Sequence, residues 1–159
     1  MILEYTQIMY TSNHVNGGTE AIELSAPICL STGKRGYKLH AKNHPSVRWA
    51  SESLAHYMWL NKLALDLVKE HTFRFCPKQV HASYQHILWL QEHPPPMLLS
   101  KLEWIRDPPT AMPEEFRMYT DTIRCYHAYY NGSKREQGLL KYTKRHLPHI
   151  FATKAHKSV

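Results

Sequence analysis

NHPSVRWASESLAHYMWLNKLALDLVKEHTFR, the stretch from Asn43 to Arg74, decides the predicted fold. Its apolar residues recur at helical spacing with almost no glycine or β-branched interruption, which predicts one long amphipathic helix at about residues 45–72. Pro45 suits the first turn of such a helix, and Asn43 or Ser46 can cap its free amides. We therefore expect a mainly α protein, a compact helical bundle around this central helix with long irregular loops. The residues that set the spacing are Val47, Ala50, Leu54, Tyr57, Met58, Ala64, Leu65 and Val68.

Three polar residues interrupt the apolar pattern at a regular interval. Arg48, Glu52 and His56 follow one another four residues apart, so on one continuous helix they would line a single face. Two interpretations are open: a polar cluster that faces a cleft, or an ion-paired face in solvent. We expect the polar cluster that faces a cleft, with Glu52 and His56 as one wall of a site.

The other expected elements follow from breakers and periodicity. The segment from 14 to 42 is broken by glycines and a proline, which predicts a long loop with at most a short strand or turn near Ala26 to Leu30. Asn131-Gly132 is expected to close the helix that begins near Pro113. The expected helices cover residues 1–13, 45–72, 78–92, 113–130 and, strongly basic, 134–146.

Length and composition favour one domain. The chain has 159 residues and no run of 18 apolar residues, and its start lacks the pattern of a secretory signal, so we expect a cytoplasmic protein without a membrane partner. A single helical domain is expected over residues 1–150, followed by a basic, flexible tail at 151–159. Three widely spaced cysteines without a C-x-x-C pair, and His40 and His44 in a loop context, predict no metal site and no cofactor.

The charge of the chain favours a polyanionic partner. The formal net charge is +7 and the pI is near 9.3, and phosphate neutralisation supplies most non-specific affinity for nucleic acids. Basic residues alternate with aromatic residues in the loop before the central helix, a mixture that suits phosphate contact and base stacking. A second basic segment lies near the carboxyl end. The predicted nucleic-acid contacts are Lys34, Arg35, Lys38, Lys42, His44 and Arg48 in the first segment and Lys134, Arg135, Lys141, Lys144 and Arg145 in the second.

Glu4 is the candidate acid–base residue of the opening helix. Its apolar neighbours Leu3 and Tyr5 allow a partly buried carboxylate with a raised pKa, the state that acid–base chemistry requires. The alternative is an ordinary surface glutamate. No glycine-rich phosphate loop, G-x-S-x-G or H-E-x-x-H motif is present.

Five stretches, taken in chain order, cover most of the sequence. They are MILEYTQIMYT at 1–11, KNHPSVRWASESLAHYMWL at 42–60, EHTFRF at 70–75 followed by Lys78 and His81, PPTAMPEEFR at 108–117 and CYHAYYNGSK at 125–134. Together they resemble a group of small phage-encoded proteins that are distantly similar to the pyrimidine-dimer DNA glycosylase/AP lyase of the endonuclease V type. The link to the glycosylase depends on the helical build, the helix-borne glutamate, the P-x-E-F-R turn and the aromatic carboxyl segment.

The resemblance implies an enzyme in the host-cell cytoplasm that binds damaged duplex DNA and extrudes a base. Such an enzyme attacks the sugar C1′ with an amine at its amino terminus, forms an imine, and uses a glutamate of its first helix. Glu4 matches that glutamate, and Arg48, Arg117 and Lys134 are implied as phosphate or base contacts. Members of the group carry a further amino-terminal segment that contains the nucleophile. The nucleophile is therefore absent, or the amine of Met1 takes its role, or the activity has been lost.

The functional prediction is a DNA glycosylase/AP lyase that acts through an imine, with Met1, Glu4, Glu52 and His56 as its catalytic residues. The alternative is a non-catalytic phage accessory protein of the same fold that binds nucleic acid or a nucleotide. A third possibility, an enzyme acting on a small nucleotide, predicts a deep closed pocket over Glu52 and His56 in place of an open basic groove.

Overall fold

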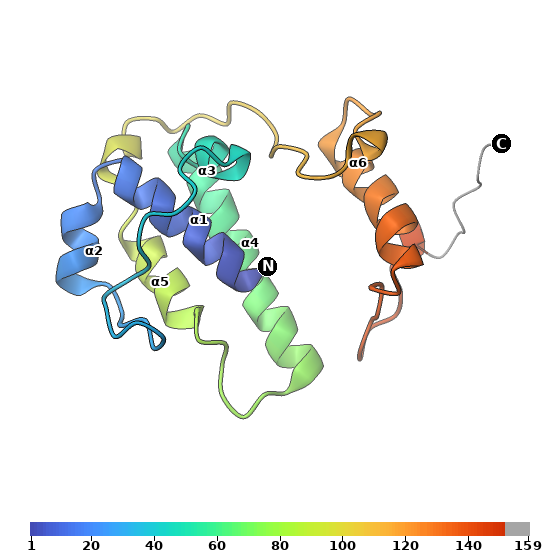
Figure 1. The fold of residues 1–159 in the computed structure, drawn as a ribbon, viewed down its shortest axis with the longest axis horizontal. Helices are drawn as coiled ribbons and strands as arrows, with labels where there is room; N and C mark the ends of the chain where they lie inside the picture. The colour runs from blue at the N-terminus through green and yellow to red at the C-terminus, as the bar shows by residue number, and fades with distance from the viewer. Residues whose placement is uncertain (152–159) are drawn as a thin grey trace. The chain divides into compact units, whose positions relative to one another are not determined.

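The computed structural model describes residues 1–151, and its internal contacts divide the chain into two compact units, Met1–Arg106 and Asp107–Val159 (Figure 1). Six α-helices and a single isolated β-bridge lie within these described residues, so the predicted mainly α class is confirmed. A single domain over residues 1–150 stays a prediction. Apart from Phe151, the predicted tail at 151–159 lies outside the described residues.

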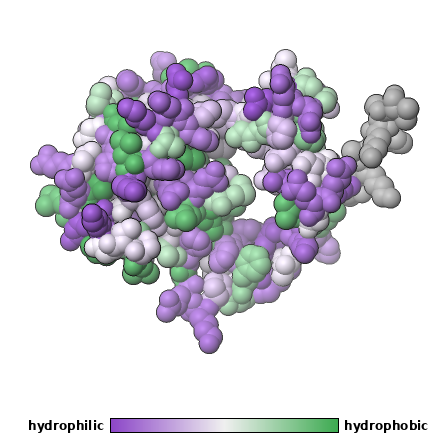
Figure 2. All heavy atoms as spheres, viewed as in Figure 1, coloured by the Kyte–Doolittle hydropathy of each residue, from purple (hydrophilic) through white to green (hydrophobic). Residues whose placement is uncertain are grey.

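Unit 1 is a bundle in which α1 and α4 form the centre. Helix α1 contacts α2, α3, α4 and α5, and α4 also packs on α3 and α5 (Figure 1). The fully buried side chains Tyr10, Tyr57, Ile87 and Leu90 show that α1, α4 and α5 share one apolar core. Hydrophilic residues cover much of the visible face of unit 1, with hydrophobic residues interspersed (Figure 2). The helices are α1 (Ile2–Val15), α2 (Thr19–Ser25), α3 (Pro45–Ala50), α4 (Leu54–Phe75) and α5 (Tyr84–Glu92), followed by the 3₁₀ turn η1 (Pro96–Leu98).

The long central helix is present as α4, but the predicted span from residue 45 contains a break at residues 51–53. Ser53 is extended, and its hydroxyl accepts a hydrogen bond from the His56 N–H at 3.2 Å, which starts α4 anew. The Leu54 N–H donates to the Lys101 carbonyl at 2.7 Å, outside any helix. Serine side chains compete with the helical backbone for hydrogen bonds, and this competition explains the break.

The cap of α3 also differs from the prediction. Pro45 occupies the first turn as expected, but the cap is His44, whose Nδ1 accepts from the Ser46 N–H at 3.2 Å. Asn43 and Ser46 do not cap the helix with their side chains. An imidazole nitrogen with a free lone pair satisfies an orphan amide as a hydroxyl or amide oxygen would.

The segment before α3 is more ordered than the predicted loop. It contains the helix α2, which the breaker pattern did not reveal, and a β-bridge between Ile28 and Arg35. Gly36 closes this turn at φ +61°, and a Cβ there would lie 2.7 Å from side-chain atoms of Ile22 and Tyr10. Only glycine therefore fits this position without a shift of the core.

Among the described residues of unit 2 there is one α-helix, and it begins later than predicted. The expected start near Pro113 holds only the 3₁₀ turn η2 (Glu114–Phe116), and α6 (Thr122–Tyr129) begins where Asp121 caps it through the Ile123 and Arg124 amides at 2.7 and 3.4 Å. Asn131-Gly132 does not end the helix, because both residues lie in the π-helical turn η3 (Tyr130–Lys134).

The last expected helix of unit 2, at residues 134–146, is absent. Helical backbone ends near Glu136, and Gly138 follows at φ +69°. The 3₁₀ turn η4 (His149–Phe151) then buries Phe151 beside Tyr130 and Tyr142. Over the described part of the chain, none of the helices is long and apolar enough to cross a membrane.

Candidate functional site

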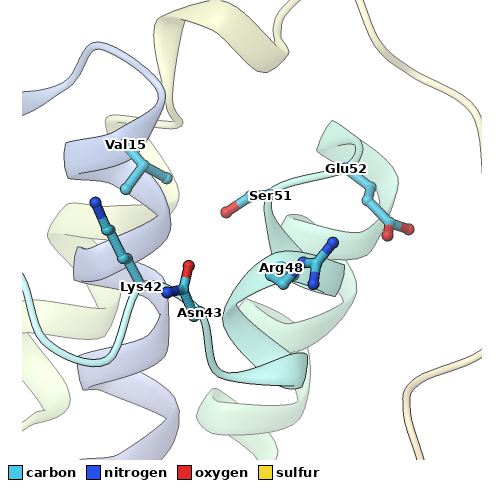
Figure 3. A pocket seen from close by; sticks show the side chains of 6 residues that line it. All are labelled: Val15, Lys42, Asn43, Arg48, Ser51 and Glu52. Atoms are coloured by element: carbon cyan, nitrogen blue, oxygen red, sulfur yellow. The ribbon is translucent and has the colours of Figure 1, made fainter.

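An open hollow of about 450 Å³ lies in unit 1 between the end of α1 and helix α3 (Figure 3). It brings together two predicted nucleic-acid contacts, Lys42 and Arg48, with the predicted catalytic residue Glu52. In the view of Figure 3, Arg48 lies between Lys42 and Glu52. The lining residues are Val15, Lys42, Asn43, Arg48, Ser51 and Glu52.

Helix α1 holds the basic loop on one side of this hollow. The Thr11 hydroxyl donates to the His40 carbonyl at 3.0 Å and accepts from the His40 N–H at 3.2 Å. One turn later, His14 Nε2 bonds to the Tyr37 carbonyl at 3.0 Å. On the other side, the Ser51 hydroxyl donates to the Ser12 hydroxyl at 3.0 Å. The backbone that carries Lys42 and Arg48 is therefore fixed on both sides by α1.

The electrostatics of the hollow favour an anion. Glu52 is occupied by Arg106, whose Nε donates to Oε2 at 3.0 Å while its Nη2 bonds to Oε1. This pairing with Glu52 raises the pKa of the Arg106 guanidinium. Lys42 and Arg48 are exposed, and neither has an ion pair within residues 1–151. The one carboxylate of the site is neutralised, while two cations face solvent.

His56 does not line this hollow, although its Nδ1 lies 3.8 Å from Glu52 Oε2, so the predicted polar stripe is present only in part. Its side chain is fully buried and stacks on Trp49 at 4.5 Å between ring centroids. Its Nε2 accepts from the Ile105 and Arg106 amides at 3.1 and 3.3 Å, so the ring proton lies on Nδ1 and is donated to the Trp49 carbonyl at 2.9 Å. Both nitrogens are used in holding the backbone, which leaves no free atom for acid–base chemistry.

Glu4 and Met1 lie at the other end of α1, so the four predicted catalytic residues do not form one site. Val15 lines the hollow, and Glu4 precedes it by eleven residues, about 16 Å along a helix axis. Glu4 is exposed rather than partly buried. The two walls predicted for the site are therefore separate surfaces of unit 1.

A second group of polar residues surrounds the start of α1. The pKa of His81 is lowered by partial burial, by the neighbouring His71 and by the positive charge of the Met1 amine. The His71 and His81 rings meet edge to face at 5.6 Å. Met1 is 63% exposed and its carbonyl accepts from the Tyr5 N–H at 2.9 Å, so its backbone begins α1. His81 is a neighbour that the predicted catalytic set did not include.

The remaining basic residues of unit 1 do not line the hollow. Arg35 donates through Nη1 to the Ala26 carbonyl at 2.8 Å and belongs to the β-bridge, so part of its side chain has a structural role. Lys34 and Lys38 are exposed in the same loop. His44 is exposed and caps α3. Within this set only Lys42 and Arg48 line the hollow.

The predicted contacts of unit 2 lie around α6, η3 and the segment after it. Arg117 donates through Nε to the Met112 carbonyl at 2.8 Å. The Lys134 ammonium lies 5.1 Å from the centroid of the Tyr129 ring. Arg135 is half-buried, and Lys141, Lys144 and Arg145 are exposed on irregular backbone.

Sequence reasoning missed Asn43, Ser51 and Arg106 as parts of the site. Arg106 follows a proline-poor apolar segment and carries no motif, and it reaches Glu52 only because His56 binds its backbone. Asn43 and Ser51 could have been found, since they are polar residues that flank a short helix and such residues can face a ligand. The prediction of one uninterrupted helix hid the short helix that they flank.

Comparison of the chain with protein-family models, with curated proteins and with solved structures found no match. The resemblance to the glycosylase-like phage proteins therefore stays a prediction. In the described part of the chain, no three His, Cys, Asp or Glu side chains are grouped so that they could hold a metal ion.

Proposed function

We propose that unit 1 binds the phosphate backbone of a nucleic acid, with DNA as the expected partner, in the hollow at Lys42 and Arg48. One observation carries the proposal: two exposed cations line one concave surface whose carboxylate is already bound by Arg106. A guanidinium can bind phosphate through two parallel hydrogen bonds, and a lysine adds a point charge.

One neutral residue of the hollow suits the same ligand. The Asn43 amide is a hydrogen-bond donor, and side chains of this kind share with Arg and Lys most protein contacts to phosphate oxygens. The Ser51 hydroxyl donates its proton to Ser12, so it positions the end of α3 and does not donate to phosphate in this arrangement. The hollow is open, which fits a polymer passing across it better than an enclosed small nucleotide.

The test is a matched pair of double variants. Lys42→Gln with Arg48→Gln removes the two cations of the hollow, and Lys34→Gln with Lys38→Gln removes the same charge from the same loop outside it. Affinity for a labelled DNA oligonucleotide is measured by fluorescence anisotropy between about 50 and 200 mM salt. We expect the first pair to weaken binding roughly tenfold more than the second and to lower the salt slope by about 1.8, since each phosphate contact contributes about 0.9.

Equal losses in the two double variants would show that the net charge alone attracts DNA and that the hollow has no special role. Binding by the wild type that does not change with salt would remove the phosphate proposal altogether. Circular dichroism of each variant confirms that the helices are retained.

The catalytic form of the predicted function is a second candidate, and its supporting observation is that the positive charge of the Met1 amine contributes to the lowered pKa of His81. An unprotonated amine adds to the aldehyde carbon C1′ of an abasic site, and loss of water then gives the imine. His81 has a lowered pKa and is neutral at pH 7, so it can accept the proton that the amine releases. Glu4, in the first turn of α1, is the candidate for proton transfer at the sugar.

Borohydride trapping tests this candidate independently of the hollow. The protein is incubated with DNA that carries an abasic site, and reduction of an imine gives a covalent adduct. We expect an adduct with the wild type, a weaker one with His81→Gln, and strand cleavage that falls with Glu4→Gln. No adduct and no nicking, with unchanged salt-dependent binding, would leave the non-catalytic form as the function.

A further inference from the structure

Two tryptophan rings lie exposed on unit 1 beside the Glu52–Arg106 pair. Trp59, from α4, is 41% exposed and Trp104 is 45% exposed. Both meet the buried Trp49 edge to face, with ring centroids 5.7 and 5.8 Å away, and their own centroids are 6.1 Å apart. Large aromatic side chains gain most when buried, so two neighbouring exposed indoles indicate a surface that a ligand covers.

The backbone next to Trp104 is fixed by hydrogen bonds. His56 Nε2 accepts from the amides of Ile105 and Arg106, and Trp49 Nε1 donates to the Arg106 carbonyl at 2.9 Å. The Trp104 ring itself packs edge to face on His56 at 5.0 Å. These contacts hold the ring in place before any ligand arrives, so binding to it loses little conformational entropy.

The two rings and the phosphate hollow are joined by Glu52. Glu52 lines the hollow, and its carboxylate holds the guanidinium of Arg106, two residues after Trp104. Lys42 and Arg48 therefore line the hollow with one carboxylate that Arg106 neutralises, and Trp104 lies two residues from Arg106. A ligand that matches this arrangement carries negative charge and flat apolar faces.

We propose that Trp59 and Trp104 stack unpaired nucleobases, so that unit 1 takes single-stranded nucleic acid in place of the duplex expected from the sequence. The inference rests on the proposed phosphate contact at Lys42 and Arg48 and adds the class of strand. In a duplex the base faces are covered by their neighbours, whereas a single strand offers them to aromatic side chains next to a positive groove.

The test compares three labelled probes of equal length at one salt concentration: a single-stranded thymidine oligonucleotide, a strand of tetrahydrofuran abasic analogues, which have the same phosphates and no reactive aldehyde, and a duplex. We expect the thymidine strand to bind roughly tenfold or more tightly than the abasic strand, because stacking of one base contributes about this factor. Binding of the thymidine strand should also quench tryptophan fluorescence.

Substitutions then assign the difference to the two rings. Trp59→Ala and Trp104→Ala should each bring thymidine binding down toward that of the abasic strand, while Trp59→Phe retains part of the preference. Leu102→Ala is the control, since Leu102 is 65% exposed in the same segment and is no stacking residue. Should Trp104→Ala unfold, Trp59→Ala decides alone, because an exposed ring on α4 can be removed without loss of the core.

Equal affinity for the thymidine and abasic strands, or a preference for the duplex, would overturn the stacking inference and leave the phosphate proposal intact. Failure of all three probes to bind in a salt-dependent manner would overturn both. An unchanged thymidine affinity in both alanine variants would show that the rings serve another partner and would also overturn the inference.

Discussion

The chain has two basic regions with the same number of Lys and Arg residues and different structure. Residues 34–48 of unit 1 and residues 134–145 of unit 2 each contain five Lys or Arg residues. In the first region, hydrogen bonds from Thr11 and His14 of α1 fix the loop, and two cations line one hollow. In the second, the backbone after η3 is irregular, and Lys144 lies at φ +58°, in the left-handed region that favours glycine.

The difference shows that charge content does not make a binding site by itself. A basic segment gains specificity when a packed core fixes the directions of its side chains, and otherwise it adds only long-range attraction. Substitutions that remove contacts between the core and the first region, or that reduce the charge of the second region, test this difference.

The largest effect is expected for His56→Ala, which leaves the buried side of the Ile105 and Arg106 amides without an acceptor. An unsatisfied buried donor costs about 1–3 kcal/mol, and the lost ring adds a cavity. We expect the free energy of unfolding of unit 1 to fall by about 3–5 kcal/mol, and the Glu52–Arg106 pair to loosen. Urea unfolding followed by tryptophan fluorescence measures this, because all four tryptophans lie in unit 1.

The matched control is His127→Ala in α6 of unit 2. His127 is half-buried and its ring meets Phe151 at 6.2 Å. The tryptophan transition should stay where it is in this variant. A shift equal to that of His56→Ala would mean that loss of any histidine destabilises unit 1, and that His56 has no special part in holding the segment at 105–106.

The second effect concerns the turn that precedes the basic loop. Gly36→Ala places a methyl group 2.7 Å from Ile22 and Tyr10 atoms at a positive φ, so we expect a loss of about 2–4 kcal/mol. Gly33→Ala, at φ +67° with open space around it, carries only the backbone cost of about 1 kcal/mol. The urea unfolding midpoints of the two variants are compared, and their difference isolates the steric part of the destabilisation. Equal midpoints would contradict the tight packing at Gly36.

Sequence periodicity predicted the mainly helical class, the opening helix and the central helix, because core-facing residues recur with the helical period. It did not predict the break at residues 51–53. The break depends on the Ser53 cap and on the Lys101 carbonyl, which accepts from the Leu54 N–H although it lies far along the chain. The late start of α6 likewise follows from the cap at Asp121, which outweighs the proline and the acidic residues near 113–115.

The candidate site was predicted in part, for a physical reason. Lys42, Arg48 and Glu52 are close in sequence to one short helix, so local reasoning places them together. Arg106, Trp59 and Trp104 join them through contacts between distant segments, which no local pattern encodes. The expected pairing of Glu4 with Glu52 failed because the direction of α1 relative to α3 is set by packing.

The third effect tests the second basic region. Neutralising Lys141, Lys144 and Arg145 together by glutamine should weaken binding to DNA by less than about tenfold and equally for all probes, since the phosphates that attract a basic segment are common to all of them. Anisotropy titrations at several salt concentrations measure this. A loss larger than that of the Lys42→Gln, Arg48→Gln variant, or one confined to a single probe, would transfer the binding site to unit 2.

The smallest effect is a dependence of stability on pH that is caused by a histidine, His86, in the core under the first basic region. His86 is buried, and burial lowers its pKa below the usual value of 6.5, although a hydrogen bond with the Ile28 backbone opposes this shift. Its Nδ1 lies 2.8 Å from the Tyr10 hydroxyl, and the Tyr37 ring packs against it at 4.9 Å. The pKa of both tyrosines is raised by burial, so neither titrates in the acid range, and the Tyr10 hydroxyl remains a donor to the neutral ring.

The sign of the effect follows from the lowered pKa. Below about pH 6.5 the unfolded chain binds a proton at His86 that the folded protein does not, so stability is complete above this pH and falls as the pH decreases toward the folded pKa. The loss is about 1.4 kcal/mol for each unit by which the two pKa values differ. His86→Gln should flatten the acid side of the stability curve measured by urea midpoints between pH 7 and 5. His81→Gln removes a second lowered pKa, at the start of α1. If the double variant still loses the full amount of stability between pH 7 and 5, other groups cause the pH dependence. Protonation of His86 would then not affect the packing beneath the basic loop.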